Sequence, residues 1–142
     1  MNILYGAIPE QKAWRTLVVM TPSDTPGTTW ELGLQLARAY AVLASGGVRR
    51  PVSFLRLDAA PAGERIMNER VARQVNSMLE EVTGPQGTAL TARVSGYRVG
   101  GKTGTVRKSI AGGYAEDKYL AVFAGMAPVS DPRLVMVVMV NE

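Results

Sequence analysis

The sequence contains no cysteine and no histidine among its 142 residues. The first absence excludes disulfide bonds, and the two together exclude zinc sites built from cysteine and histidine. They also exclude a catalytic triad or dyad in which histidine is the general base. Lysine is therefore the natural general base for any nucleophilic chemistry within this chain. We expect the protein to bind no metal and no cofactor.

Long apolar runs are missing as well. No run approaches the roughly 18 residues that a membrane-spanning helix needs. The opening residues 1–6 lack the basic segment and the long apolar segment of a signal peptide. We therefore expect no membrane span, signal or anchor within this chain.

The charge is modest, with a net value of +4. A nucleic-acid-binding surface concentrates its basic residues on one face, with aromatic residues between them. Here the arginines are scattered, and Arg49-Arg50 is the only adjacent pair. The sequence thus favours no nucleic-acid partner, and its excess positive charge suits solubility and a local attraction for small anions.

A chain of this length corresponds to one domain or to part of one. Its first segment, residues 1–31, is left unassigned. Within it Thr16–Met20 is a short apolar run that is typical of a strand, and residues 21–29 combine proline, glycine and small polar residues as loops do.

Two amphipathic helices are predicted after this segment. The first covers residues 32–45, where apolar residues recur at spacings of three and four, and it ends at Ser45-Gly46-Gly47. The second covers residues 68–82, with Asn68 as its N-cap. The predicted buried stripes are Leu32, Leu36, Ala39, Tyr40 and Leu43 in the first helix, and Val71, Val75, Met78, Leu79 and Val82 in the second; Arg70, Arg73, Glu80 and Glu81 would form the solvated face of the second.

Extended structure is predicted elsewhere, apart from a short helix at residues 88–93. Residues 48–58 should be extended, and three strands should end the chain, separated by a polar connection at 109–118 and a tighter turn at 129–132. The last strand, 134–140, is almost entirely β-branched or methionine, which fits burial on both faces. The expected fold class is therefore α+β, an antiparallel sheet with helices packed on it.

One short stretch, Lys102-Thr103-Gly104-Thr105, has the composition of an anion-binding strand. Lys102 offers a positive charge with three donors, and the two threonines offer hydroxyls. Side chains alternate along a strand, so Thr103 and Thr105 should face one way and Lys102 the other. Gly104 leaves room for the backbone of a ligand. We interpret this stretch as a strand that binds the carboxylate of a peptide-like ligand along its edge.

Lys102-Thr103-Gly104 and its surroundings resemble the class B penicillin-binding proteins, in particular the septal (cell-division) peptidoglycan D,D-transpeptidase of Gram-negative bacteria. Several segments resemble this family in the same order, from residue 32 to residue 142. The segments that carry the resemblance are 34–44, 47–51, 97–108, 119–128 and 131–140. It implies that residues 32–142 form part of a transpeptidase domain with the β-lactamase-like fold, in which Lys102, Thr103, Gly104 and Thr105 bind the substrate.

The chemistry that this resemblance implies is acyl transfer. In the family, the serine of an S-x-x-K motif attacks the D-Ala-D-Ala end of a peptidoglycan stem peptide or a β-lactam, an S-x-N motif assists, and the K-T-G strand docks the substrate. None of the four lysines here follows a serine by three positions, and no asparagine follows a serine by two. We therefore expect no catalytic residue in this chain, because an acyl-enzyme cannot form without its nucleophile.

The family is anchored in the inner membrane with its catalytic domain in the periplasm, where other division proteins are further partners. The long carboxy-terminal helix that covers the sheet in the family has no counterpart in this sequence. Two hypotheses remain open: a truncated transpeptidase domain, or a non-catalytic peptide-binding or interaction module that holds a partner by β-augmentation. An enzyme whose threonine or serine nucleophile is activated by Lys102 is a third possibility.

Overall fold

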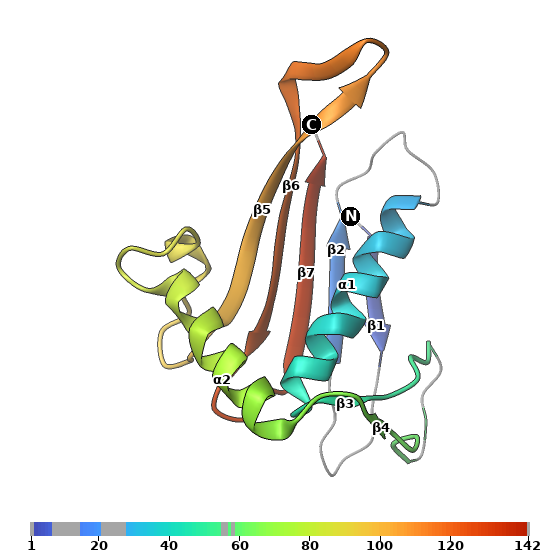
Figure 1. The fold of residues 1–142 in the computed structure, drawn as a ribbon, viewed down its shortest axis with the longest axis vertical. Coiled ribbons are helices and arrows are strands. Elements are labelled where there is room, and N and C mark those ends of the chain that lie inside the picture. The colour runs from blue at the N-terminus through green and yellow to red at the C-terminus, as the bar shows by residue number, and fades with distance from the viewer. Residues whose placement is uncertain (1, 7–14, 21–27, 55–56, 58, 142) are drawn as a thin grey trace.

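The computed structural model describes residues 2–6, 15–20, 28–54, 57 and 59–141. It shows an α+β fold with helices packed on a five-stranded sheet (Figure 1). In spatial order, the strands of the sheet are β1 (Asn2–Gly6), β2 (Arg15–Met20), β7 (Leu134–Asn141), β6 (Gly113–Ala127) and β5 (Gly100–Ile110). The helices are α1 (Thr28–Ala44) and α2 (Glu69–Leu79), with two 3-10 turns, η1 (Glu80–Thr83) and η2 (Leu90–Ala92); β3 (Val48–Arg49) and β4 (Glu64–Arg65) form a separate two-stranded sheet.

The three strands predicted at the end of the chain are confirmed, and they pair antiparallel in the order β5, β6, β7. The strand predicted at Thr16–Met20 is confirmed as β2. It lies beside β7 and is parallel to it, with Thr16 opposite Val135 and Met20 opposite Met139. One parallel pair therefore joins the beginning of the chain to its end in an otherwise antiparallel sheet.

The polar connection predicted at 109–118 is wrong, because β5 and β6 continue through it as a hairpin. Ile110 pairs with Gly113, so that only Ala111 and Gly112 form the turn. Leu120 pairs with the last residue of β7, and beyond it no described strand pairs with the hairpin. It projects from the sheet as a two-stranded arm (Figure 1). The turn predicted at 129–132 is confirmed between β6 and β7.

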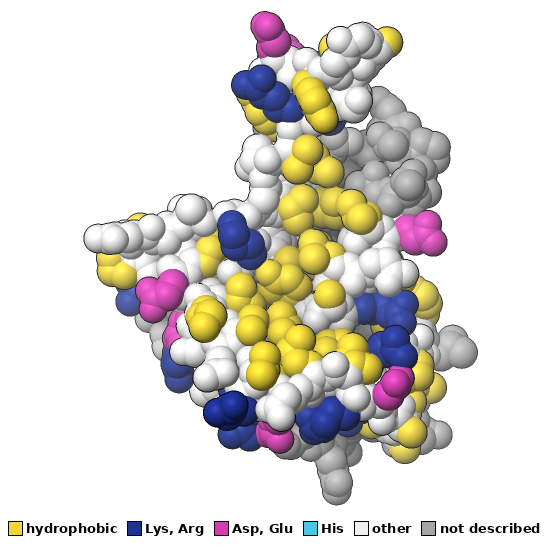
Figure 2. All heavy atoms as spheres, in the orientation of Figure 1, with side chains coloured by type: hydrophobic (Ala, Val, Ile, Leu, Met, Phe, Trp, Pro, Cys, Tyr) yellow, Lys and Arg dark blue, Asp and Glu magenta, His cyan; other side chains and the backbone are white. Residues whose placement is uncertain are grey.

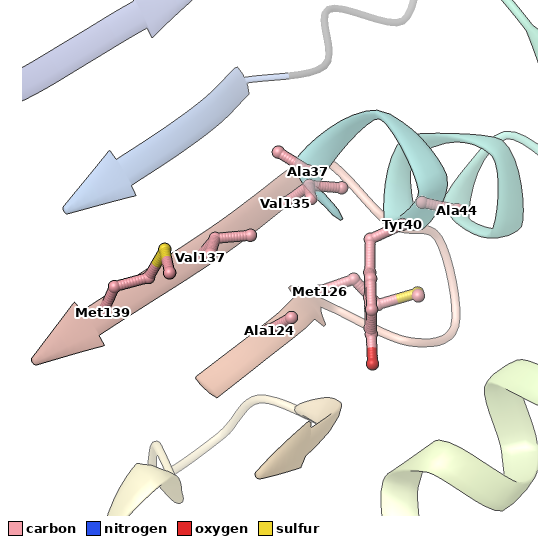
Figure 3. Packing of buried hydrophobic residues seen from close by; sticks show 8 residues of the cluster. All are labelled: Ala37, Tyr40, Ala44, Ala124, Met126, Val135, Val137 and Met139. Carbon is pink, nitrogen blue, oxygen red and sulfur yellow. The ribbon is translucent and has the colours of Figure 1, made fainter. Parts of the chain in front are cut away.

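The hydrophobic core lies where α1 covers one face of β6 and β7 (Figure 3). Alternate residues of β7 point into it, as the two-residue period of a strand requires. Its buried residues are Ala37, Tyr40 and Ala44 of α1, Ala124 and Met126 of β6, and Val135, Val137 and Met139 of β7. Hydrophobic side chains also form a continuous band on this side of the molecule, from the helices towards the hairpin arm (Figure 2).

The predicted burial of β7 on both faces is wrong. Val135, Val137 and Met139 are 0–2% exposed, whereas Leu134, Met136 and Val138 on the opposite face are only half-buried and Val140 is exposed. Composition alone cannot separate the two cases, because a β-branched run is compatible with burial on one face or on both. Whether both faces of such a strand are buried depends on whether other elements pack on one face of the sheet or on both.

The first predicted helix is confirmed as α1, but its buried stripe is partly wrong. Tyr40 is buried and Leu36 and Leu43 are half-buried as predicted, whereas Leu32 and Ala39 are exposed. Ala37 takes their place, at 0% exposure against the sheet. A small residue permits the helix to approach the strands closely, so the closest contact occurs at an alanine rather than at a leucine.

The second predicted helix is confirmed as α2 continued by η1. The Asn68 side chain accepts a hydrogen bond from the amide of Arg70 at 2.9 Å, which is the predicted N-cap. Val82 is buried and Val75 and Leu79 are half-buried as predicted, but Val71 and Met78 are exposed. The buried positions of α2 are Ala72 and Asn76, and the Asn76 amide donates to the carbonyl of Leu43 at 3.0 Å.

The remaining predictions are confirmed in part. The short helix at 88–93 is η2. The extended stretch at 48–58 is reduced to the two residues of β3, and Phe54 is exposed; residues 55, 56 and 58 lie outside the described residues. Of the loop predicted at 21–29, residues 21–27 also lie outside them, and α1 already begins at Thr28.

Candidate functional site

The predicted ligand-binding stretch lies on β5, the last strand of the sheet. Lys102, Thr103, Gly104 and Thr105 pair on one side with β6, from Ala124 to Ala121 in register. Among the residues that the structure describes, no strand pairs with the other side of β5. An edge of this kind offers backbone donors and acceptors to an extended ligand.

The four residues are accessible from solvent. Lys102, Gly104 and Thr105 are exposed and Thr103 is half-buried. The register is unbroken from Gly100 to Arg107, so that alternation places Thr103 and Thr105 on the same face of the strand. The Lys102 ammonium reaches along the strand and donates to the carbonyl oxygen of Thr103 at 2.7 Å.

Two glycines before the stretch allow close packing rather than an unusual backbone angle. Neither Gly100 nor Gly101 has a positive φ. A Cβ at Gly101 would lie 2.4 Å from the Ala124 carbonyl oxygen, and one at Gly100 would lie 2.8 Å from the Val129 side chain. Gly104 differs, because a Cβ there would meet nothing within 4 Å. The space predicted beside Gly104 is therefore present.

Side-chain contacts that the sequence does not predict attach the start of β5 to the turn that follows α2. Arg98 donates to Glu80 through Nε and through Nη2, each at 2.6 Å. The buried Thr83 hydroxyl donates to the carbonyl of Val99 at 2.9 Å. The turn between β6 and β7 adds a third contact, in which the amide of Val129 donates to the carbonyl of Arg98 at 2.8 Å. These contacts hold the residues immediately before the candidate site.

Electrostatics favours the charged form of this ion pair. The hydrogen bond from Arg98 is the main cause that lowers the pKa of Glu80 below its ordinary value of 4.5, although partial burial opposes it. The sequence predicts Glu80 on a solvated face, and this is wrong because only 27% of its side chain is exposed and Arg98 is its partner. Helix periodicity carries no signal for a partner 18 positions away.

A second contact reaches the candidate site itself. The hydroxyls of Thr88 and Thr103 lie 2.7 Å apart, and either oxygen can be the donor. Thr88 belongs to the loop between η1 and η2, 15 positions before Thr103. The sequence predicts a short helix from residue 88, and its pattern identifies neither Thr88 nor Thr83 as a contact of β5.

The candidate site offers chemical groups that can bind an anion. It combines one ammonium, two hydroxyls on one face and an open strand edge, which suits an anionic, extended ligand. In the described part of the chain, no three side chains of the metal-ligating types gather in one place. No described helix is long and apolar enough to cross a membrane.

Comparison with known proteins gives this geometry a context. A family model of the penicillin binding protein transpeptidase domain matches residues 33–142, more than three quarters of the chain. The chain belongs to this family. This match confirms the resemblance to class B penicillin-binding proteins that rests on Lys102-Thr103-Gly104 and its surroundings.

Curated relatives cover nearly the whole chain. The probable peptidoglycan D,D-transpeptidase PenA of Neisseria meningitidis is 42% identical over 137 residues, which are 96% of this chain and 23% of the relative. The peptidoglycan D,D-transpeptidase FtsI of Escherichia coli is 38% identical over 144 aligned positions, again covering 96% and 23%. The chain therefore spans about a quarter of the length of these transpeptidases. Their alignments reach into residues 1–31, where the sequence analysis found no resemblance.

A solved transpeptidase structure supports the same fold. The apo structure of the transpeptidase domain from Burkholderia pseudomallei penicillin-binding protein 3 is 46% identical and superposes with a TM-score of 0.68. The match covers 76% of this chain and 33% of that chain. The chain thus has a partial transpeptidase fold, with the K-T-G strand at the edge of its sheet.

Proposed function

We propose that this chain forms the substrate-docking part of a peptidoglycan D,D-transpeptidase, in which Lys102, Thr103, Gly104 and Thr105 bind the terminal carboxylate of a D-Ala-D-Ala stem peptide. One observation carries the proposal: in a chain of this family, the K-T-G stretch lies on a sheet edge that no described strand covers. β-Lactam antibiotics also carry a carboxylate, and we propose that they bind to the same strand.

The site suits a carboxylate for three physical reasons. The hydroxyls of Thr103 and Thr105 lie on one face of β5 and can each donate one hydrogen bond to an anionic oxygen. Lys102 adds a positive charge on the same strand, with its ammonium 2.7 Å from the backbone carbonyl oxygen of Thr103. The open backbone edge beside Gly104 can pair with the peptide that precedes the carboxylate.

The chain contributes binding and not the acyl-transfer step. It has no S-x-x-K and no S-x-N motif, so the nucleophile and its base are not among its 142 residues. In the proposed transpeptidase they belong to another part of the protein. We further propose that this protein acts at the division septum, held in the inner membrane with the domain in the periplasm, where other division proteins are its partners.

The test is a titration of the ¹⁵N-labelled 142-residue chain with an acetylated peptide that ends in D-Ala-D-Ala, followed by NMR. We expect the amide signals of residues 102–105 to shift with the free carboxylate and not with the carboxamide form of the same peptide. Lys102→Ala should weaken this binding, whereas Lys118→Ala, an exposed lysine on the hairpin arm, should not. Shifts that are equal for the carboxylate and the carboxamide would contradict the proposal.

The same titration tests the alternative of a non-catalytic interaction module. The missing nucleophile favours that alternative for the chain by itself. A module that binds by β-augmentation reads the peptide backbone, so it would bind the carboxamide as well as the carboxylate. Incubation with a fluorescent β-lactam distinguishes these two binding functions from an enzyme that forms an acyl intermediate. We expect no stoichiometric covalent labelling of the chain, and such labelling would show an unrecognised nucleophile.

A further inference from the structure

The loop between η1 and η2 reaches β5 at the middle of the candidate site, through the hydroxyl pair of Thr88 and Thr103. We propose that Thr88 is a positioning residue that orients the Thr103 hydroxyl so that its proton points to the carboxylate of the ligand. This inference rests on the proposed function, because it assigns a role to Thr88 in the same carboxylate-binding site.

The loop holds Thr88 in a defined place. The amide of Gly87 donates to the carbonyl of Gly84 at 2.9 Å, and the amide of the buried Ala89 donates to the carbonyl of Val82 at 2.9 Å. A Cβ at Gly87 would lie 2.1 Å from the Val82 carbonyl oxygen, so only glycine fits the observed approach. The residues on both sides of Thr88 are therefore hydrogen-bonded, Gly87 to the residue that follows η1 and Ala89 to η1 itself.

The loop is also tied to the strand that it serves. The buried Thr83 hydroxyl at its start donates to the carbonyl of Val99, and Thr88 near its end contacts Thr103. Val99 directly precedes β5 and Thr103 lies on it, four positions further along the chain. Two attachments along this segment fix the distance between the loop and β5, so the contact of Thr88 does not depend on a single surface hydrogen bond.

The number of protons on the two hydroxyls determines what the contact between Thr88 and Thr103 can do. Each hydroxyl carries one proton and two acceptor sites. Thr103 can donate to a carboxylate only if its own proton is not directed to Thr88, which requires Thr88 to act as the donor. A hydroxyl that accepts one hydrogen bond also becomes a stronger donor in the next one. Binding of an anion at Thr103 thus selects one of the two orientations that the pair permits.

Thr105 provides an internal comparison. It lies on the same face of β5 as Thr103 and is exposed. Among the described residues its side chain has no hydrogen-bond partner, so none of them orients its hydroxyl as Thr88 orients that of Thr103. A substitution at Thr88 should therefore change the contribution of Thr103 to binding and leave that of Thr105 unchanged.

The experiment is a double-mutant cycle in the full chain, with the peptide titration described above as the readout. Thr88→Val removes the hydroxyl at nearly constant size and should weaken binding of the carboxylate peptide about 3- to 10-fold, as loss of one hydrogen bond does. Thr88→Ser keeps the hydroxyl and should restore binding to within about 2-fold. The loss should vanish in the Thr103→Val background and persist in the Thr105→Val background.

A second readout does not depend on binding. In the free chain, three-bond coupling constants of Thr103 should report one χ1 rotamer in the wild type and an average over rotamers in Thr88→Val. Unchanged coupling constants, or a binding loss that persists without the Thr103 hydroxyl, would overturn the inference. If the wild-type chain does not distinguish the carboxylate from the carboxamide, the proposed function fails while the coupling constants still decide whether Thr88 orients Thr103.

Discussion

Glu80 and Arg98 are joined by two parallel hydrogen bonds of 2.6 Å, which connect the first residue of η1 to the segment that leads into β5. This two-point geometry fixes the orientation of the guanidinium as well as its position. Gly100 lies directly beside the same turn, since a Cβ there would be 3.3 Å from the Glu80 amide nitrogen. The ion pair thus holds the candidate binding strand against the end of α2.

The ion pair predicts a pH dependence of stability. Because the folded-state pKa of Glu80 is lower than its ordinary value of 4.5, its contribution is complete above pH 4.5 and is lost as the pH falls through the lowered pKa. We expect Glu80→Gln to lower the thermal midpoint at about pH 7, and the difference from the wild type to shrink as the pH falls through the lowered pKa. Glu81→Gln, at the exposed neighbour, is the control. A difference between wild type and Glu80→Gln that stays constant over this range would contradict the role of the ion pair.

Two glycines of β5 should respond differently to alanine. At Gly101 the new Cβ would lie 2.4 Å from the Ala124 carbonyl oxygen, so Gly101→Ala must push β5 away from β6 and should lower the free energy of unfolding by about 1–3 kcal/mol. At Gly104 the space is open, and Gly104→Ala should leave the thermal midpoint unchanged. It should nevertheless weaken binding of the D-Ala-D-Ala peptide by occupying the space proposed for the ligand. Unchanged binding would place the ligand elsewhere.

The one-sided burial of β7 predicts unequal effects along one strand. Val137 is 0% exposed beneath α1, and its truncation to alanine should cost about 2–3 kcal/mol through lost burial and a residual cavity. Val140, 37% exposed, provides the matched control, and Val140→Ala should cost less than about 1 kcal/mol. Chemical denaturation of both variants measures the difference. Equal costs would mean that α1 does not cover β7 as observed.

Asn76 links α2 to α1, and we expect different substitutions of this residue to lower the stability of the fold by different amounts. Its amide donates to the Leu43 carbonyl, and its side-chain oxygen has no partner among the described residues. Asn76→Ala should cost about 0.5–1.5 kcal/mol, the value of one hydrogen bond. Asn76→Asp would place an unpaired buried carboxylate beside that carbonyl and should cost about 3 kcal/mol or more at neutral pH. The exposed Gln74→Ala is the control, and an Asp variant as stable as the Ala variant would contradict this geometry.

The sequence by itself determined the features that have a local cause. Asn68 caps α2 because its side chain can accept a hydrogen bond from an amide two residues away, whatever the rest of the fold does. Lys102, Thr103, Gly104 and Thr105 lie on a strand, and the alternation of their side chains follows from the two-residue period of any strand. The sequence was also sufficient to identify the family, because the order of Lys102-Thr103-Gly104 and its neighbouring segments along the chain does not depend on tertiary contacts.

Only the tertiary structure decided which surfaces meet. Ala37 rather than Leu32 faces the sheet because the approach of α1 to β7 favours a small side chain, and periodicity alone does not choose between neighbouring faces of a helix. The contacts of Glu80 with Arg98 and of Thr88 with Thr103 join residues 18 and 15 positions apart. Such contacts leave no periodic signal, since their geometry exists only after the chain has brought η1, its loop and β5 together.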